Sequence, residues 1–444
     1  MIRLAEVPLF LGFWGPRLYG EWLMLFTIPS YLTLGNGGFC VAACHDMTMQ
    51  GQTGERHGVL ATFQSTWLLI IMVSITILAC VAIFVSVAPL TCWLGFSVIG
   101  EGQVKIVLFL LTMYILAGFQ YSLLSGGFLI LGRYPMAMAL QALTQSLEFA
   151  GLACAIILGY GPIGAATGLL AGRLLGVGIY WAFQRRLTPW LRHGISHASF
   201  SEIRRLFAPS LASLALPLGD ALNIQGIRLI VGLVLGPPAV AVFATMRTMA
   251  RLARQPPNVV SRLLEPELSI AFGLKDGILF TKLLAKSCQA ALWGCLTACL
   301  LLLPAARWLY PLWTAHRIAI HWPTFIILLA VSLVNGVWYT SLMAPYSTNR
   351  HGRIAAYYWL IYGGAVFGLG YLGAAWIGFR GAALALLAAE CAMTAVVVHA
   401  SARMTDMGVA EFFKTIAHPP FDFLRRGLDA VINRSIQAAN ERGR

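Results

Sequence analysis

The sequence predicts an all-α membrane protein with about twelve transmembrane helices, arranged as two pseudo-symmetric six-helix bundles around a central cavity. Of the 444 residues, 59% are hydrophobic and only 11% are charged, and the mean hydropathy is +0.76. Soluble domains carry about 25% charged residues. The apolar residues form long runs between short polar turns, and motifs of the first half recur in the second in the same order. These three observations together predict the fold class.

The first half contains one short apolar run and five long ones. The short run, Val7–Gly15, cannot cross a hydrocarbon core of about 30 Å, and it lacks the cleavage site of a signal peptide. We therefore expect a truncated first helix that begins before Met1. Each long run predicts one helix: Leu18–Ala43, Thr66–Pro89, Val104–Leu131, Met136–Gly159 and Pro162–Phe183.

A polar and basic stretch, residues 184–205, separates the two halves and predicts a cytoplasmic linker. We expect an N-terminal six-helix lobe over residues 1–183, a C-terminal six-helix lobe over 206–402, and a cytoplasmic basic amphipathic tail over 403–444. The second lobe contains six further runs: Leu206–Leu235, Ala239–Leu263, Leu283–Ala306, Trp322–Tyr346, Ile354–Ile377 and Ala382–Ser401.

The two halves resemble each other in parallel. Gly15–Trp22 aligns without a gap on Gly236–Phe243, and a polar turn containing glycine follows each segment, at 51–55 and at 273–277. Parallel six-helix repeats imply a pseudo-twofold axis along the membrane normal, with a cleft between the lobes.

Lysine and arginine gather in the loops on one side of the predicted spans, for example at Arg133, Arg185 and Arg186. The positive-inside rule places these loops and both termini in the cytosol. The net charge of +14 then reflects topology and anionic headgroups rather than nucleic acid. In the tail, Phe421, Leu424 and Leu428 keep helical spacing, which predicts either an interfacial helix or a solvated tail.

Arginines inside the apolar runs are the candidate binding residues. Arg247, Arg251 and Arg254 fall within about 60° of arc on a continuous α-helix. Because an arginine at the bilayer centre costs about 2.5–3.5 kcal/mol, such a stripe is expected to face water, protein or an anionic ligand. Arg247 lies about 15 Å along the helix from Pro237, near the midplane. Arg251 and Arg254 have the alternative of extending to the nearby surface.

Two more intramembrane arginines, Arg173 and Arg228, join this set, and the intramembrane acids are Asp220, Glu148 and Glu390. Each acid is a candidate for an arginine partner or for a proton or sodium site. The alternative for the arginines is a set of ion pairs that holds helices together. The polar residues Asn223, Gln225 and Asn335 are candidates for hydrogen bonds to sugars or between helices.

Four segments of the chain resemble a known family. They are GPRLYGEW (15–22), SYLTLGNGGF (30–39), RLIVGLVLGPPAVAVFATMR (228–247) and LLEPELSIAFGLKDG (263–277). They are similar to the polysaccharide flippases of the MOP superfamily, which include Wzx-type O-antigen and exopolysaccharide transporters. Lipid II flippases and MATE exporters are related. The resemblance covers about Val7 to Arg403. Asn36 and the short first helix depart from the pattern, because relatives often carry an acid at the position of Asn36.

The resemblance implies a flippase that moves undecaprenyl-pyrophosphate-linked oligosaccharides across the bacterial inner membrane by alternating access, for polysaccharide export. No cofactor is implied, but coupling to a proton or sodium gradient is. The implied partners are the lipid-linked oligosaccharide, membrane lipids, and a polysaccharide polymerase with its export machinery. A diphosphate suits arginine forks. We therefore expect Arg247 and Arg173 to grip it, with Arg251, Arg254 and Arg228 assisting.

Two alternatives remain. A MATE-like cation-coupled exporter of drugs or other small molecules would carry acids and aromatic residues in its cavity. A membrane enzyme would need a large outer loop or an acidic pair, whereas the outer loops are short and glycine-rich phosphate loops are lacking. We expect His45 and Asp46, the nearest acid–base pair, to be polar surface. We expect no metal site, because the nine cysteines lie mostly in apolar runs without a ligand pattern.

Overall fold

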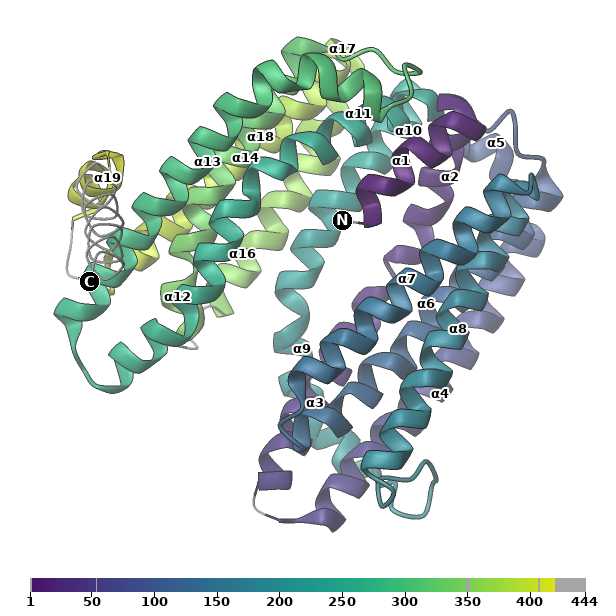
Figure 1. The fold of residues 1–444 in the computed structure, drawn as a ribbon, viewed down its shortest axis with the longest axis vertical. Helices are drawn as coiled ribbons and strands as arrows, with labels where there is room; N and C mark the ends of the chain where they lie inside the picture. Colours follow the sequence, from purple (N-terminus) through teal and green to yellow (C-terminus); the bar gives the residue numbers. More distant parts are fainter. Residues whose placement is uncertain (1, 53, 349–351, 406–407, 420–444) are drawn as a thin grey trace, which may run out of the picture. The chain divides into compact units, whose positions relative to one another are not determined.

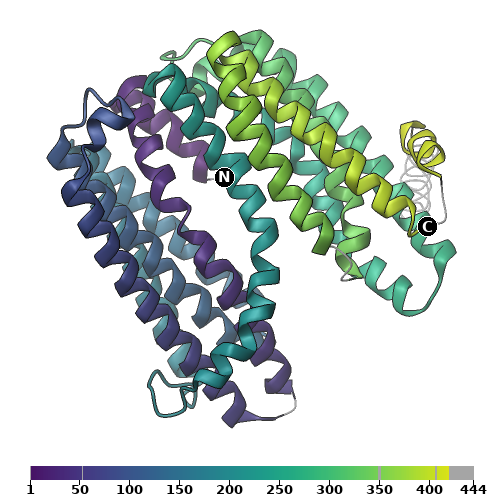
Figure 2. The ribbon, with the colours of Figure 1, turned by 180° about the vertical axis from the view of Figure 1, so that it is seen from behind.

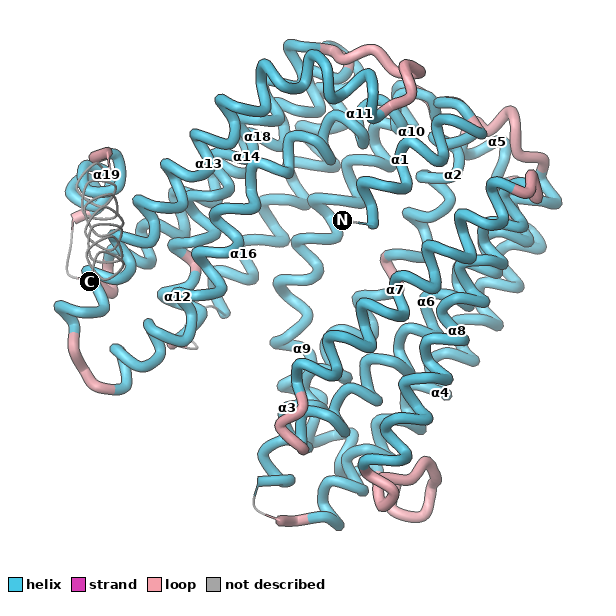
Figure 3. Tube along the Cα trace, viewed as in Figure 1, coloured by secondary structure: helices cyan, strands magenta, loops and turns pink. Residues whose placement is uncertain are grey.

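The computed structural model describes residues 2–52, 54–348, 352–405 and 408–419. All regular secondary structure in these ranges is helical (Figures 1 and 3). Eight of the described helices are long and apolar enough to span a membrane. Large apolar side chains along α4 (Arg56–Val87), such as Ile75 and Ile83, are 62% and 67% exposed, as expected for a surface that faces acyl chains. The chain is therefore a multi-pass membrane protein.

The helices follow one another along the whole described chain. The first half contains α1 (Ile2–Phe13), α2 (Gly15–Ser30), α3 (Thr33–Gln52), α4, α5 (Leu90–Leu94), α6 (Glu101–Ile130), α7 (Tyr134–Ile157) and α8 (Gly161–Leu187). The second half contains α9 (Phe200–Ala221), η1 (Leu222–Gly226), α10 (Ile227–Leu235), α11 (Pro237–Ala250), η2 (Arg251–Arg254), α12 (Gln255–Gly273), α13 (Gly277–Trp313), α14 (Trp322–Ser341), α15 (Met343–Ser347), α16 (Gly352–Gly363), η3 (Gly364–Gly370), α17 (Tyr371–Ile377), α18 (Phe379–Ala402) and α19 (Val409–Ala417).

Each predicted apolar run lies in one helix or in consecutive helices, so the predicted all-α class is confirmed. Several boundaries were wrong. Helix α4 begins at Arg56 instead of Thr66, and α13 has 37 residues instead of ending at Ala306. Helical hydrogen bonding does not stop where the apolar run stops, because polar residues at the interface also form helix. The amphipathic tail segment predicted around Phe421 lies outside the described residues.

The predicted run Leu18–Ala43 is two helices, α2 and α3, and the interruption lies at Tyr31 and Leu32. Pro29 lies in the last turn of α2, and proline removes a backbone donor. The Ser30 hydroxyl donates to the carbonyl of Phe26 at 2.8 Å, a contact that often bends helices. Hydropathy alone cannot detect such an interruption, because the apolar run continues through it.

Two π-helical segments interrupt spans that the sequence predicts as continuous. Segment η1 separates α9 from α10, and η3 separates α16 from α17. The two segments pack closely, since a Cβ on Gly226 would lie 2.9 Å from Cγ1 of Val366. A π-helical turn displaces carbonyls from the regular ladder and is frequent at functional sites.

The chain folds into two compact units. The first comprises Met1–Thr248, Arg307–Thr324 and Ala355–Leu386, and the second comprises Met249–Ala306, Phe325–Ile354 and Leu387–Arg444. Within the first unit, α4, α6, α7 and α8 run side by side (Figures 1 and 2). The division into lobes at residues 184–205 remains a prediction.

The predicted linker is partly helical, because α8 continues to Leu187 and α9 begins at Phe200. The segment between them, residues 188–199, is attached to α4. The Gln64 amide donates to the carbonyl of Arg192 at 3.1 Å and accepts from the His197 N–H at 2.8 Å. This segment is therefore a loop that is packed on the first unit rather than an unattached linker.

Candidate functional site

The first unit encloses a cavity of about 300 Å³. One part of its lining is aromatic and apolar and comes mainly from α1 and α2, and another part is polar and comes mainly from α6, α7, α8, η1 and α10. The lining comprises Glu6, Val7, Phe10, Tyr19, Trp22, Leu23, Phe26, Tyr114, Gln145, Glu148, Phe149, Leu152, Leu169, Arg173, Gln225, Arg228, Ala244 and Thr248. Aromatic walls with a few convergent polar groups are typical of ligand sites.

The polar part of the cavity depends on close packing between α7 and α8. Helix α8 carries glycine at every fourth position, Gly164, Gly168, Gly172 and Gly176, which we call the glycine row. A Cβ on Gly168 would lie 2.3 Å from the carbonyl oxygen of Gly151, and one on Gly172 would lie 2.6 Å from Cα of Glu148. Small residues at this spacing allow helix backbones to approach. The glycine row therefore brings Glu148 beside Arg173.

Arg173 and Glu148 form a two-point ion pair in the cavity. Arg173 Nε lies 2.5 Å from Glu148 Oε1, and Nη2 donates to Oε2 at 3.1 Å. Tyr114 completes the group: its hydroxyl donates to Glu148 Oε2 at 2.9 Å and accepts from Arg173 Nη2 at 2.6 Å. The guanidinium carbon also lies 4.3 Å from the centroid of the Tyr114 ring. The side chain of Arg173 is 19% exposed and that of Glu148 is 8% exposed.

Arg228 is the second predicted arginine that lines the cavity. It is half-buried, and its Nη1 donates to Oε1 of Gln225 at 3.3 Å. Gln225 belongs to η1 and lines the same cavity. With Glu6 and Glu148, the lining holds two arginines and two glutamates, so its formal charges balance when all four are ionised.

The aromatic wall is built by side chains that pack on one another. Phe10 stacks on Tyr19 with ring centroids 5.0 Å apart, and Trp22 contacts Phe26 at 6.4 Å. Phe26 in turn lies 6.1 Å from the ring of Tyr114. The aromatic contacts therefore extend from α1 to the ion pair.

Arg247 lies in a different environment from Arg173 and Arg228. It is 6% exposed and is not in the lining of the cavity. Its Nη1 donates to the backbone carbonyl of Asn223 at 2.7 Å, and its Nη2 bonds to Oδ1 of the same residue. Asn223 belongs to η1. Arg247 therefore bonds to the backbone and the side chain of one residue of the π-helical segment.

Arg251 and Arg254 form part of η2, a 3₁₀ segment in the second unit, and both are half-buried. The predicted stripe assumed a continuous α-helix from Arg247 to Arg254, and this assumption was wrong. Three residues complete a 3₁₀ turn, so Arg251 and Arg254 share a face of η2.

The other two predicted acids have separate partners. Asp220 is exposed and accepts from the Tyr358 hydroxyl at 2.6 Å. Glu390, in the second unit, is fully buried, and its Oε2 accepts from Asn335 Nδ2 at 2.9 Å and from Trp338 Nε1 at 2.6 Å. Its Oε1 has no hydrogen-bond partner in the part of the chain that the structure describes. Asn335 of α14 thus bonds to Glu390 of α18, which agrees with the predicted alternative of hydrogen bonds between helices.

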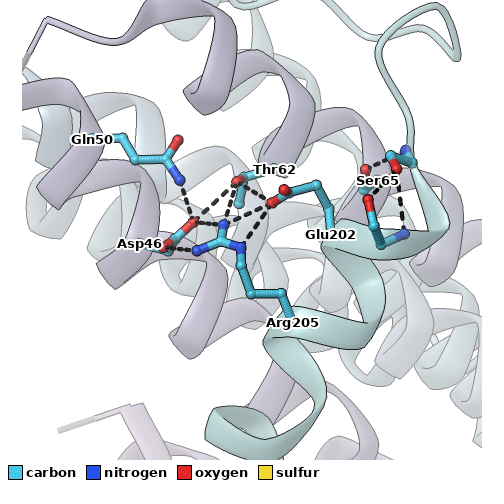
Figure 4. Close-up of polar contacts among 8 residues, drawn as sticks. Asp46, Gln50, Thr62, Ser65, Glu202 and Arg205 are labelled. Carbon is cyan, nitrogen blue, oxygen red and sulfur yellow. Dashed lines mark hydrogen bonds and ion pairs between the residues drawn. The ribbon is translucent and has the colours of Figure 1, made fainter.

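A second polar cluster was missed by the sequence analysis (Figure 4). Arg205 of α9 donates to Asp46 of α3 from both Nη atoms, at 2.8 and 2.5 Å, and from Nη2 to Glu202 at 2.7 Å. Thr62 of α4 donates to Asp46 at 3.0 Å. We call these four residues the Arg205 cluster. The expectation that Asp46 is polar surface was wrong: it is 8% exposed because α9 covers it, and the sequence does not reveal a contact across 159 positions.

Among the described residues, no three histidine, cysteine or acidic side chains come together as a metal site would require. The residues that converge on the cavity are thus cations, acids, amides and rings. This set can bind a charged ligand that also has an apolar or ring-shaped part.

No family model matches the sequence, and no curated protein matches it significantly. Solved structures match over nearly the whole chain. One is an inward-facing multidrug resistance MATE family transporter of the MOP superfamily, with TM-score 0.74, 15% identity, and coverage of 93% of this chain and 95% of that chain.

Two further solved structures match over a similar share of the chain. The lipid II flippase MurJ in its inward closed conformation has TM-score 0.67 and 14% identity, with 94% of this chain and 87% of that chain covered. A MOP superfamily transporter from Pyrococcus furiosus, described as having a binding pocket of reverse polarity, has TM-score 0.59, 14% identity, and coverage of 91% and 95%. The chain therefore has the helical transporter fold that MATE proteins and MurJ share.

Proposed function

We propose that this protein is a flippase for a lipid-linked diphosphate oligosaccharide and that it works by alternating access. The observation that carries the proposal is the pair of arginines, Arg173 and Arg228, in a cavity walled by aromatic rings. The similarity of fold to MurJ supports a lipid-linked cargo, and the sequence resemblance to Wzx-type transporters supports an undecaprenyl-pyrophosphate carrier.

The chemistry of the cavity suits a diphosphate that carries sugars. A guanidinium presents two parallel N–H donors to two phosphate oxygens, and such contacts are strong where water is excluded. The amides Gln145 and Gln225 also line the cavity and would serve sugar hydroxyls. Arg247, Arg251 and Arg254 are proposed to contribute indirectly, through η1 and η2 rather than as the first contacts of the cargo.

The location and energy source belong to the same proposal. We propose the bacterial inner membrane, cytoplasmic termini, and delivery of cargo to a polysaccharide polymerase and export machinery. The cycle would draw on a proton or sodium gradient. Of Asp220, Glu148 and Glu390, the candidate for holding a proton is Glu390, because its Oε1 makes no hydrogen bond within the described residues.

The test is transport of a lipid-linked diphosphate oligosaccharide by the full-length protein in proteoliposomes. We expect Arg173→Ala to reduce the initial rate at least ten-fold. The matched control is Arg186→Ala, which removes an exposed arginine from the same helix. Equal transport rates in the wild-type protein and Arg173→Ala would contradict a role of the cavity in transport.

A second candidate function has its own supporting observation. Glu148 and Glu6 lie in the same cavity as Phe10, Trp22 and Phe26, and acids with aromatic rings suit an organic cation. A MATE-like exporter would therefore bind an aromatic cation such as ethidium and lose that binding in Glu148→Gln. The flippase predicts no ethidium site and retained diphosphate binding in the same variant.

A further inference from the structure

The ion pair in the cavity presents Arg173 with a carboxylate in the position that a phosphate would take. Glu148 meets the guanidinium at two points, through Nε at 2.5 Å and through Nη2 at 3.1 Å. A phosphate group binds an arginine side chain in the same two-point manner. The edge of the guanidinium formed by Nε and Nη2 is therefore occupied in this structure.

The other edge of the guanidinium does not offer an equivalent site. Its Nη1 packs against the backbone of α6, because a Cβ on Gly118 would lie 2.5 Å from this atom. The face of the guanidinium lies against the ring of Tyr114. A phosphate that binds Arg173 at two points must therefore use the edge that Glu148 holds, so the two anions exclude each other there.

We propose that Glu148 is an internal competitor of the cargo, occupying Arg173 when the cavity is empty and giving way to a phosphate when cargo binds. This inference rests on the proposed function. It assigns Glu148 a role in the release of cargo and in the return of the empty transporter to its starting conformation. Without such a competitor, an empty cavity would hold a partly buried guanidinium without a counter-charge, which is unfavourable. Glu148 thus lowers cargo affinity and allows the emptied transporter to change conformation.

The surroundings of the pair support exchange rather than permanent attachment. Tyr114 bonds to both partners, at 2.6 Å to Arg173 and at 2.9 Å to Glu148. Its hydroxyl can therefore stay on Arg173 when the carboxylate leaves. The glycine row fixes the two backbones, so the exchange needs only side-chain rotation.

The direction in which the Kd for cargo changes when Glu148 is neutralised distinguishes a competitor from a residue that positions Arg173. A residue that only orients Arg173 would, when neutralised, weaken cargo binding. A competitor would, when neutralised, strengthen it. The charged groups of the cavity that act on the same cargo are Arg173, Arg228, Glu6 and Glu148, and Glu148 contacts the Nε and Nη2 edge of Arg173.

The experiment measures binding of farnesyl diphosphate to the full-length protein in nanodiscs by calorimetry. We expect Glu148→Gln to lower the Kd at least ten-fold and to slow transport, because release becomes slow. Glu55→Gln, at an exposed glutamate of the first unit, is the matched control and should change neither value. An unchanged or higher Kd in Glu148→Gln overturns the proposal.

A second variant tests the proposal independently in case Glu148→Gln does not fold. Tyr114→Phe keeps the ring and removes the hydrogen bonds of the hydroxyl to Glu148 and to Arg173. Because the bond to Arg173 is present with and without cargo, only the loss at Glu148 should change the Kd, which we expect to fall a few-fold; a raised Kd here contradicts the proposal independently. If farnesyl diphosphate binds to none of the proteins, the proposed function itself fails. If it binds with the same Kd in the wild-type protein and both variants, the cargo assignment survives and only the competition is wrong.

Discussion

Arg247 illustrates how a buried cation can be used to shape a helix. Both of its Nη atoms bond to oxygens of Asn223, one on the backbone and one on the side chain. Asn223 lies in η1, where the regular helical ladder is disturbed. The arginine donates to a buried carbonyl of this segment, so the π-helical segment and Arg247 stabilise each other.

This pairing gives a prediction for stability. Arg247→Ala leaves buried oxygens of Asn223 without these donors, and we expect a loss of about 1–3 kcal/mol. Asn223→Ala removes the side-chain acceptor and should cost less, since the backbone carbonyl remains. Thermal unfolding in detergent measures both effects.

The double variant supplies the control for the pair. If the two residues act on one another, Arg247→Ala with Asn223→Ala should cost clearly less than the sum of the single changes. Strict additivity would show that the contact contributes nothing. A raised Kd for a diphosphate with no change in stability would instead favour the original expectation that Arg247 grips the cargo.

At the same scale, Arg173 and Glu148 were both predicted from the sequence as functional residues, but the contact between them was not predicted. Their spacing of 25 positions lies across the turn between α7 and α8, so it reveals nothing by helical periodicity. The glycine row was the available signal, since glycine at every fourth residue of α8 predicts close packing against a neighbour. The identity of that neighbour still requires the fold.

At the scale of the elements, the Arg205 cluster joins three helices at the end of the first unit that carries the loop 188–199. Arg205 connects the start of α9 to α3, and Thr62 connects α3 to α4. The side chain of Arg205 is 46% exposed, so solvent weakens each ion pair, but its three nitrogens together contact two carboxylates. The cluster therefore holds the first turns of α9 in place.

The prediction at this scale concerns attachment of α9. We expect Arg205→Ala to lower the unfolding temperature by a few degrees and to raise protease cleavage in residues 188–199, because the start of α9 is released. Arg204→Ala is the matched control, since Arg204 is an exposed neighbour that makes no hydrogen bond or ion pair with any residue the structure describes. Unchanged cleavage in Arg205→Ala would mean that packing alone attaches α9.

The elements also mark where hydropathy succeeds and fails. It located α6, α7 and α8 well, because each is a single helix bounded by glycine or proline turns. It missed η1, η3 and the interruption at Tyr31, because these features change hydrogen bonding without changing polarity. The role of Glu21 was also not predicted, because its contacts join positions 76 and 78 residues apart. Glu21 is fully buried and accepts from the backbone N–H groups of Ser97 and Ile99, each at 2.8 Å.

For the whole molecule, the sequence predicted the class because a membrane imposes a simple rule. Every spanning segment must satisfy its backbone internally and must be apolar, so composition and run length suffice. The pairing of helices follows from side-chain contacts between distant positions, such as Asp46 with Arg205, and the sequence of one protein does not contain that information directly.

Orientation in the membrane is the prediction that belongs to this scale. Ile195 lies in the loop 188–199 and is 68% exposed, so Ile195→Cys should react with an impermeant maleimide only from the cytosol. Ala319→Cys, in the exposed turn between α13 and α14, should react only from outside. Both changes are made in a background without the nine native cysteines. Labelling with the sides exchanged would invert the topology.

Recognition of a diphosphate by the two cavity arginines is tested most directly by equilibrium binding of undecaprenyl diphosphate to the full-length protein in nanodiscs. We expect binding by the wild-type protein, at least ten-fold weaker binding in Arg173→Ala and in Arg228→Ala, and unchanged binding in Arg186→Ala. Equal affinity in all four proteins, or selective binding of an organic cation in place of the diphosphate, would contradict it.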